Sequence, residues 1–194
     1  MKKSNGKLNY NIAVFISGRG SNLKSIIKQS LKKKTLYNVK IVISNNQKAK
    51  GLLIAKKMRI KHYYFDFIKS KKKGRKVLKI LKENNIKLVC LAGFMRLLPA
   101  YFIKSYSGKI INIHPSLLPK YKGLNAHQKV ILNQEIYTGC TVHYVNKLLD
   151  SGKIIFQKKV RITKKDTASS IEKKVLKIEH KVYPKAIDKV LSNL

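Results

Sequence analysis

Asn112 and His114 stand two residues apart at the end of an apolar run in this 194-residue chain. If residues 109–114 form a β-strand, the alternation of side chains places the amide and the imidazole on one face. Pro115 has no N–H to continue a strand ladder, so we expect the strand to end there. A hydrogen-bond donor and a titratable base would then meet at the carboxyl end of a strand, where α/β enzymes bind their ligands.

Asp150 is the carboxylate that fits this pair best, because it lies in a glycine-containing turn, LLDSG, between two strand-like segments. It could orient His114 and raise its pKa, or it could be an ordinary turn aspartate. Glu179, late in the last helical segment, is either a functional carboxylate or a surface residue. The five histidines lack the spacing of a zinc site, and Cys90 and Cys140 form no Cys-x-x-Cys pair, so we expect no metal.

A second motif, SGRGSN, occupies residues 17–22 and joins the first strand-like run to the first helical run. Backbone N–H groups at a helix N-terminus, approached closely through two glycines, form a site for a phosphate group. The alternative is a structural turn in which Ser21 or Asn22 caps the helix. The motif is not the GxGxxG dinucleotide fingerprint, because its third glycine is missing.

Strand-like and helical runs alternate along the chain, which is typical of a parallel sheet with crossover helices. Strands are predicted at 11–17, 38–44, 62–67, 88–92, 109–114, 139–146 and 153–161, and helices at 23–33, 50–58, 76–84, 126–133 and 169–191. The last three strands follow one another closely, so the sheet should become mixed in its C-terminal half. We therefore expect an α/β, Rossmann-like three-layer sandwich with helices on both faces.

The composition indicates one globular domain over residues 1–194, with a loose N-terminal tail over residues 1–9. No apolar run is long enough to cross a membrane, and two cysteines in strand-like segments favour reduced thiols and a cytoplasmic protein. The net charge of +36 attracts polyanions. Only five of the 44 basic residues are Arg, however, and the lysines are spread throughout. We attribute the charge to biased composition and expect no nucleic-acid partner.

Six segments taken in order, SGRGSNL, LAGFMRLL, INIHPSLLPKYKGLNAH, GCTVHYV, LLDSGKII and IEHKVYP, resemble the folate-dependent phosphoribosylglycinamide formyltransferase family. The resemblance implies formyl transfer from 10-formyltetrahydrofolate to the amine of 5-phosphoribosylglycinamide (GAR). It also implies that Asn112, His114 and Asp150 are catalytic. Residues implied to bind GAR are Gly20, Ser21, Asn22 and Glu179, and residues implied to bind the folate are Met95, Arg96, Leu97, Leu98, Asn112 and, through a weaker alignment, Arg75.

Two related families and one unrelated class are the alternatives. Methionyl-tRNA formyltransferases share the core but carry a C-terminal tRNA-binding domain, and formyltetrahydrofolate hydrolases carry an extra N-terminal domain. Neither addition is expected here. A basic nucleic-acid module without activity would not need Asn112, His114 and Asp150. The sequence leaves open whether the protein is a monomer or a homodimer.

Overall fold

The computed structural model describes residues 9–194, so the predicted tail over residues 1–9 lies outside this range except for its last residue. Seven strands form one sheet in the order β3-β2-β1-β4-β5-β6-β7. They are β1 (Tyr10–Ile16), β2 (Tyr37–Ser44), β3 (Lys61–Tyr64), β4 (Ile86–Leu91), β5 (Lys109–His114), β6 (Tyr137–Tyr144) and β7 (Ile154–Arg161).

The pairings from β3 to β5 are all parallel, whereas β6 and β7 join the sheet as antiparallel strands. The mixed C-terminal half of the sheet is therefore confirmed. The strand order reverses between β1 and β4, the point at which α/β proteins open a crevice at the carboxyl ends of their strands.

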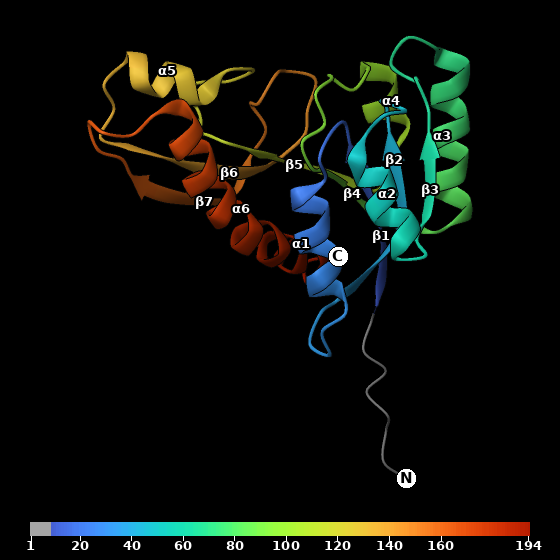
Figure 1. Ribbon diagram of the computed structural model, residues 1–194. Coiled ribbons are helices and arrows are strands. Elements are labelled where there is room, and N and C mark those ends of the chain that lie inside the picture. The colour runs from blue at the N-terminus through green and yellow to red at the C-terminus, as the bar shows by residue number, and fades with distance from the viewer. Residues whose placement is uncertain (1–8) are drawn as a thin grey trace.

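Helices cover both faces of the sheet, as predicted (Figure 1). Apolar residues of α1, α2, α5 and α6 pack with one face, and those of α3 and α4 pack with the other. The helices are α1 (Ser21–Ser30), α2 (Lys50–Lys57), α3 (Lys71–Glu83), α4 (Ala100–Ser105), α5 (Ala126–Leu132) and α6 (Ala168–Leu191).

Alternation in β1 explains the two cores, because Ile12 and Val14 belong to one cluster while Ala13 and Phe15 belong to the other. Cys90 and Cys140 are free and buried. In Figure 1, α1 and α6 lie side by side, so the first and last helices form one layer.

Two helices differ most from the sequence prediction, while the bounds of other elements differ by up to three residues. The short α4 was not predicted, because six residues are too few to show helical periodicity. Helix α3 begins at Lys71 rather than near residue 76, and the Ser70 side chain accepts a hydrogen bond from the Lys73 N–H at its start. Gly74 inside this helix allows close packing, since a Cβ there would clash with the Tyr101 hydroxyl of α4.

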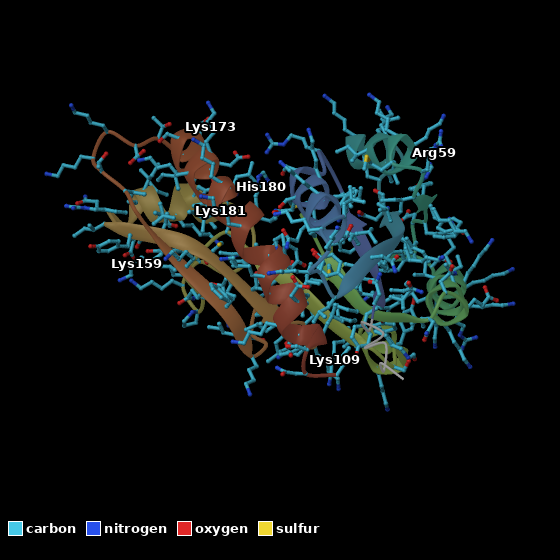
Figure 2. All side chains as sticks on the ribbon, turned by 90° about the horizontal axis from the view of Figure 1, so that it is seen from below. Arg59, Lys109, Lys159, Lys173, His180 and Lys181 are labelled. Carbon is cyan, nitrogen blue, oxygen red and sulfur yellow. The ribbon has the colours of Figure 1, made fainter. Side chains whose placement is uncertain are left out.

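Basic side chains project from many elements of the described chain (Figure 2). The labelled examples come from β5 (Lys109), β7 (Lys159), α6 (Lys173 and Lys181) and the turn after α2 (Arg59). The positive charge is thus distributed over separate parts of the molecule rather than gathered on one element.

Candidate active site

Strand β5 contains Asn112 and His114, the first two predicted site residues. Ile111 and Ile113 enter the core on the side of α1 and α6, so Asn112 and His114 share the opposite face, as the alternation predicted. The strand ends at His114, directly before Pro115. His114 is buried and Asn112 is half-buried.

Asp150 reaches both of these side chains from the loop between β6 and β7. Its Oδ2 lies 3.2 Å from His114 Nδ1, and Asn112 Nδ2 donates to its Oδ1 at 3.4 Å. The backbone φ of Asp150 is +45°, in the left-handed region that Asp tolerates better than most residues. The structure therefore brings together the three residues that were predicted to be catalytic.

The charge state of Asp150 follows from these contacts. Burial raises the pKa of its carboxyl, but contact with His143, the Gly123 N–H and the charge of His114 lower it more, to about 2. Gly123 N donates to Oδ2 at 2.9 Å. Asp150 is consequently an anion in its buried position at neutral pH.

The pKa of His114 is set by opposing effects. Burial lowers the pKa of this histidine below its ordinary value of 6.5, and the opposing effects of the Tyr121 carbonyl and Asp150 do not reverse the shift. Asp150 raises the pKa of His114, as predicted, but burial, which the sequence does not reveal, lowers it by more. Both ring nitrogens nevertheless face acceptors, Asp150 Oδ2 and, at 2.8 Å, the Tyr121 carbonyl. Only the protonated ring can donate to both.

His143 is a site residue that the sequence analysis did not single out. Strand β6 places it opposite Asn112 in the antiparallel pairing with β5. Its Nε2 lies 3.3 Å from Asn112 Nδ2 and 3.6 Å from Asp150 Oδ1, and its Nδ1 contacts the Tyr144 carbonyl at 2.8 Å. Because a carbonyl only accepts, Nδ1 carries a proton and donates to Tyr144. A histidine among the apolar, threonine and tyrosine residues of β6 was the available signal.

The glycine-rich segment forms the N-terminus of α1, with Gly20 as the capping residue at φ +77°. A Cβ on Gly20 would lie 2.7 Å from Gly51 Cα of α2, so glycine is required here both for conformation and for space. Neither Ser21 nor Asn22 caps the helix, since no side-chain capping hydrogen bond is made at this end. The alternative interpretation as an ordinary capped turn is therefore wrong in that detail.

Glu179 on α6 is joined to this segment. Asn22 Nδ2 donates to Glu179 Oε2 at 2.7 Å, and both side chains are buried. Burial raises the pKa of Glu179, while the hydrogen bond from Asn22 opposes the rise. Asn22 Oδ1 is buried without a hydrogen-bond partner. Beside this pair, Arg19 forms an ion pair with Glu172 of α6.

The segment after β4 contains Met95, Arg96, Leu97 and Leu98. Met95 and Leu97 are largely exposed, although large apolar side chains usually avoid water. Ser17 Oγ accepts from the Met95 N–H at 2.8 Å and so ties this segment to the end of β1. Arg75 does not join the group, because it lies exposed on α3 and does not line the cavity.

One cavity of about 1240 Å³ connects these parts. Its walls include Gly20, Ser21, Asn22 and Glu179, the segment from Met95 to Leu98, and the cluster of Asn112, His114, His143 and Asp150. Every predicted site residue except Arg75 is therefore in one cavity.

Within residues 9–194, no group of three or more His, Cys, Asp or Glu side chains is placed to hold a metal ion. Across the same residues, no helix is both long and apolar enough to span a membrane. The fold and the cavity define an α/β protein in which an amide, two imidazoles and a buried carboxylate lie close together in one cavity.

Comparison with known proteins identifies the family. The family model described as formyl transferase matches residues 10–187. Phosphoribosylglycinamide formyltransferase from Haemophilus influenzae is 38% identical over 179 residues, covering 91% of this chain and 84% of that protein. The chain belongs to the formyl transferase family.

Solved structures agree with this assignment. Phosphoribosylglycinamide formyltransferase from Anaplasma phagocytophilum is 41% identical with a TM-score of 0.88, over 94% of this chain and 87% of that one. The enzyme of that name from Brucella melitensis is 36% identical with a TM-score of 0.89, over 96% and 97% of the two chains.

Longer relatives also match. The trifunctional purine biosynthetic protein adenosine-3 of Gallus gallus is 39% identical over 196 residues, which cover 96% of this chain. The present chain spans only 19% of that protein's length.

Proposed function

We propose that this chain transfers the formyl group of 10-formyltetrahydrofolate to the amine of GAR, giving formyl-GAR and tetrahydrofolate. The names of the H. influenzae, A. phagocytophilum and B. melitensis relatives support the choice of acceptor. Two free, buried thiols fit a cytoplasmic enzyme, acting on these small molecules as a single domain.

The size and continuity of the cavity carry this proposal. Pockets for one small molecule usually have volumes of about 300–1,000 Å³, and this cavity of about 1240 Å³ exceeds that range. It exposes a helix N-terminus suited to phosphate at the α1 segment and apolar side chains suited to a folate ring at residues 95–98. A site for two ligands at once is what a direct transfer between them requires.

Each part of the cavity has a role in the proposal. Gly20, Ser21 and Asn22 bind the phosphate of GAR, and Glu179 meets its glycinamide end. The apolar wall at Met95, Leu97 and Leu98, together with Arg96, binds the folate. Arg75 is left out of this set, because it does not line the cavity.

The chemistry begins with attack of the neutral amine on the formyl carbon. A C–N bond forms, the carbonyl electron pair moves to oxygen, and the nitrogen becomes an ammonium. Asn112 and the protonated ring of His114 stabilise the oxyanion by hydrogen bonds. When the bond from carbon to the folate nitrogen breaks, that nitrogen takes up a proton and the amine nitrogen loses one, so the charges balance.

Asp150 assists by favouring the charged form of His114. Burial works against that form, and the negative charge that develops on the substrate oxygen works with Asp150 in its favour. Asn112 Nδ2 makes only long contacts, 3.3 and 3.4 Å, with His143 and Asp150. A donor held so weakly can turn to the oxyanion at small cost.

The test is to follow conversion of 10-formyltetrahydrofolate to tetrahydrofolate spectroscopically, with and without GAR. We expect conversion only when GAR is present, and sequential rather than ping-pong kinetics because no covalent enzyme intermediate is needed. Conversion without GAR would instead indicate a hydrolase, and absence of conversion under both conditions would reject both activities.

A further inference from the structure

Glu135, in the connection between α5 and β6, lies outside the cavity but contacts a segment that supports it. Its Oε1 accepts hydrogen bonds from Lys120 Nζ at 2.6 Å and from the Tyr121 hydroxyl at 2.7 Å. Its own N–H donates to the carbonyl of Val130 in α5 at 3.2 Å. Glu135 thus joins the end of α5, through its backbone N–H, to a loop at residues 120–123, through its carboxylate.

That loop supplies backbone groups to both members of the His114 and Asp150 pair. The Tyr121 carbonyl contacts His114 Nε2 at 2.8 Å, and the Gly123 N–H donates to Asp150 Oδ2 at 2.9 Å. Any shift of residues 120–123 therefore changes the partners of both residues together.

The backbone of Tyr121 is held in an uncommon conformation, with φ +58°. A tyrosine in the left-handed region costs of order 1 kcal/mol or more and persists only where neighbouring contacts impose it. The hydrogen bond from its hydroxyl to Glu135 is such a contact, and the same residue turns its carbonyl toward His114.

Other contacts also hold this loop: hydrogen bonds fix its beginning, and the Tyr121 side chain packs against the core on the side of α1 and α6. The Ser116 hydroxyl donates to the Lys120 carbonyl at 2.6 Å, and Thr141 of β6 donates to the Ser116 carbonyl at 2.7 Å. With the beginning of the loop fixed in this way, Glu135 is the side chain that holds Tyr121 by its phenol.

We propose that Glu135 is a positioning residue that acts through Tyr121 to hold residues 120–123 against His114 and Asp150. This inference rests on the proposed function for its kinetic consequences. Its structural part, the contact between the Tyr121 carbonyl and His114, can be tested without any substrate.

The contact has a measurable consequence for His114. The Tyr121 carbonyl raises the pKa of His114 and so offsets part of the lowering caused by burial. Loss of Glu135 would loosen that contact, and the pKa of His114 should fall further below its ordinary value.

The kinetic experiment compares Glu135→Ala, Tyr121→Phe and the double variant with the wild-type chain. Because a misplacement of catalytic groups by even 1 Å can cost up to about 100-fold in rate, we expect each single variant to lose about tenfold in kcat. The KM values for GAR and 10-formyltetrahydrofolate should stay within about twofold. The double variant should be no worse than the worse single variant, since both changes remove one hydrogen bond.

Two further variants sharpen the test. Glu135→Gln keeps an oxygen that can accept from Tyr121, so it should recover most of the activity that Glu135→Ala loses. Glu83→Gln removes an exposed ion pair with Lys79 on α3 and should behave as wild type. Fully additive losses in the double variant, or wild-type kcat in Glu135→Ala, would refute the proposal.

The substrate-free measurement is a ¹⁵N NMR titration of the histidines, with the His114 resonance assigned from a His114→Asn variant. We expect a lower titration midpoint for His114 in Glu135→Ala than in wild type. An unchanged midpoint would show that Glu135 has only a structural role and would overturn the inference. If the wild-type enzyme transfers no formyl group to GAR, the proposed function fails, and this titration still decides the role of Glu135.

Discussion

The Asp150 carboxylate contacts most of the polar groups that meet around His114. This carboxylate is only 8% exposed, yet it remains ionised because His114, His143 and the Gly123 N–H surround it. Removing one member of such a cluster leaves the other groups buried without a hydrogen-bond or charge partner, which lowers stability.

We expect Asp150→Asn to lower kcat at least about 100-fold, a loss comparable to that of a single oxyanion-stabilising group in other enzymes. The amide cannot stabilise the charged form of His114, so the step that needs this charge slows. Steady-state kinetics and circular dichroism would show a folded but impaired enzyme.

Asp166→Asn is the matched control for that variant. Asp166 also has a lowered pKa, through bonds to Lys174, Ser170 and Thr163, but it lies near the start of α6 and does not line the cavity. Replacing Asp166 should lower the free energy of unfolding and leave kcat unchanged. Near wild-type kcat in Asp150→Asn would contradict the assigned role of Asp150.

Acid should remove the stabilisation that Asp150 provides. Its carboxyl has a pKa of about 2 in the folded protein against a usual value of 3.8. Its contribution, about 2 kcal/mol for a shift of this size, is therefore complete above pH 4 and is lost as the pH falls toward 2. Urea unfolding at pH 5 and pH 2.5 should show a larger loss of stability for wild type than for Asp150→Asn. Equal losses in the two proteins would rule this linkage out.

At the scale of elements, the start of α1 depends on its contact with α2. Gly20 adopts φ +77° and lies close to Gly51, and Gly51 N donates to the Gly18 carbonyl at 3.0 Å. The backbone at the N-terminus of α1 can face a phosphate only while the two helices keep this approach.

Gly20→Ala should therefore lower the free energy of unfolding by roughly 1–3 kcal/mol, because it adds backbone strain and a clash with Gly51. The KM for GAR should rise as the helix terminus is displaced. Gly18→Ala is the comparison for stability, since a Cβ there would meet nothing within 4 Å. Urea unfolding and GAR titration measure both effects, and equal stability of the two variants would disprove the steric argument.

The central elements could be predicted from the sequence because their signals are local. The strand from Lys109 to His114 has the predicted bounds, and its alternation places Asn112 and His114 on one face. His143 depends on something that is not local, the register of an antiparallel pair that sets it opposite Asn112. Burial of His114 is equally nonlocal, since it arises from segments distant in sequence, and so its lowering effect on the pKa could not be predicted.

For the whole molecule, the net charge of +36 acts on substrates before they bind. Both proposed substrates are anions, and a positive field raises their rate of encounter with the cavity. Because the basic residues are distributed over many elements (Figure 2), the attraction is long-ranged and sensitive to salt.

We expect kcat/KM for GAR to fall severalfold between about 50 and 500 mM NaCl, since the screening length shortens from more than 10 Å to a few ångströms. The value of kcat at saturating substrate should change little, because it reports steps after binding. Stopped-flow or steady-state assays over this range measure both, and a kcat/KM independent of salt would exclude steering.

The hydrogen bond between Asn22 and Glu179 joins residues 157 positions apart, and Tyr183, one turn further along α6, donates to the carbonyls of Leu91 and Ile111. During synthesis, the segment at the start of α1 emerges early and must wait for α6 before it has its partner. The end of the cavity that we propose binds GAR is therefore completed only when α6 packs against the rest of the fold. A ribosome-bound chain that stops before α6 would already contain Asn112, His114 and Asp150, yet it would lack a wall of the cavity in which they act.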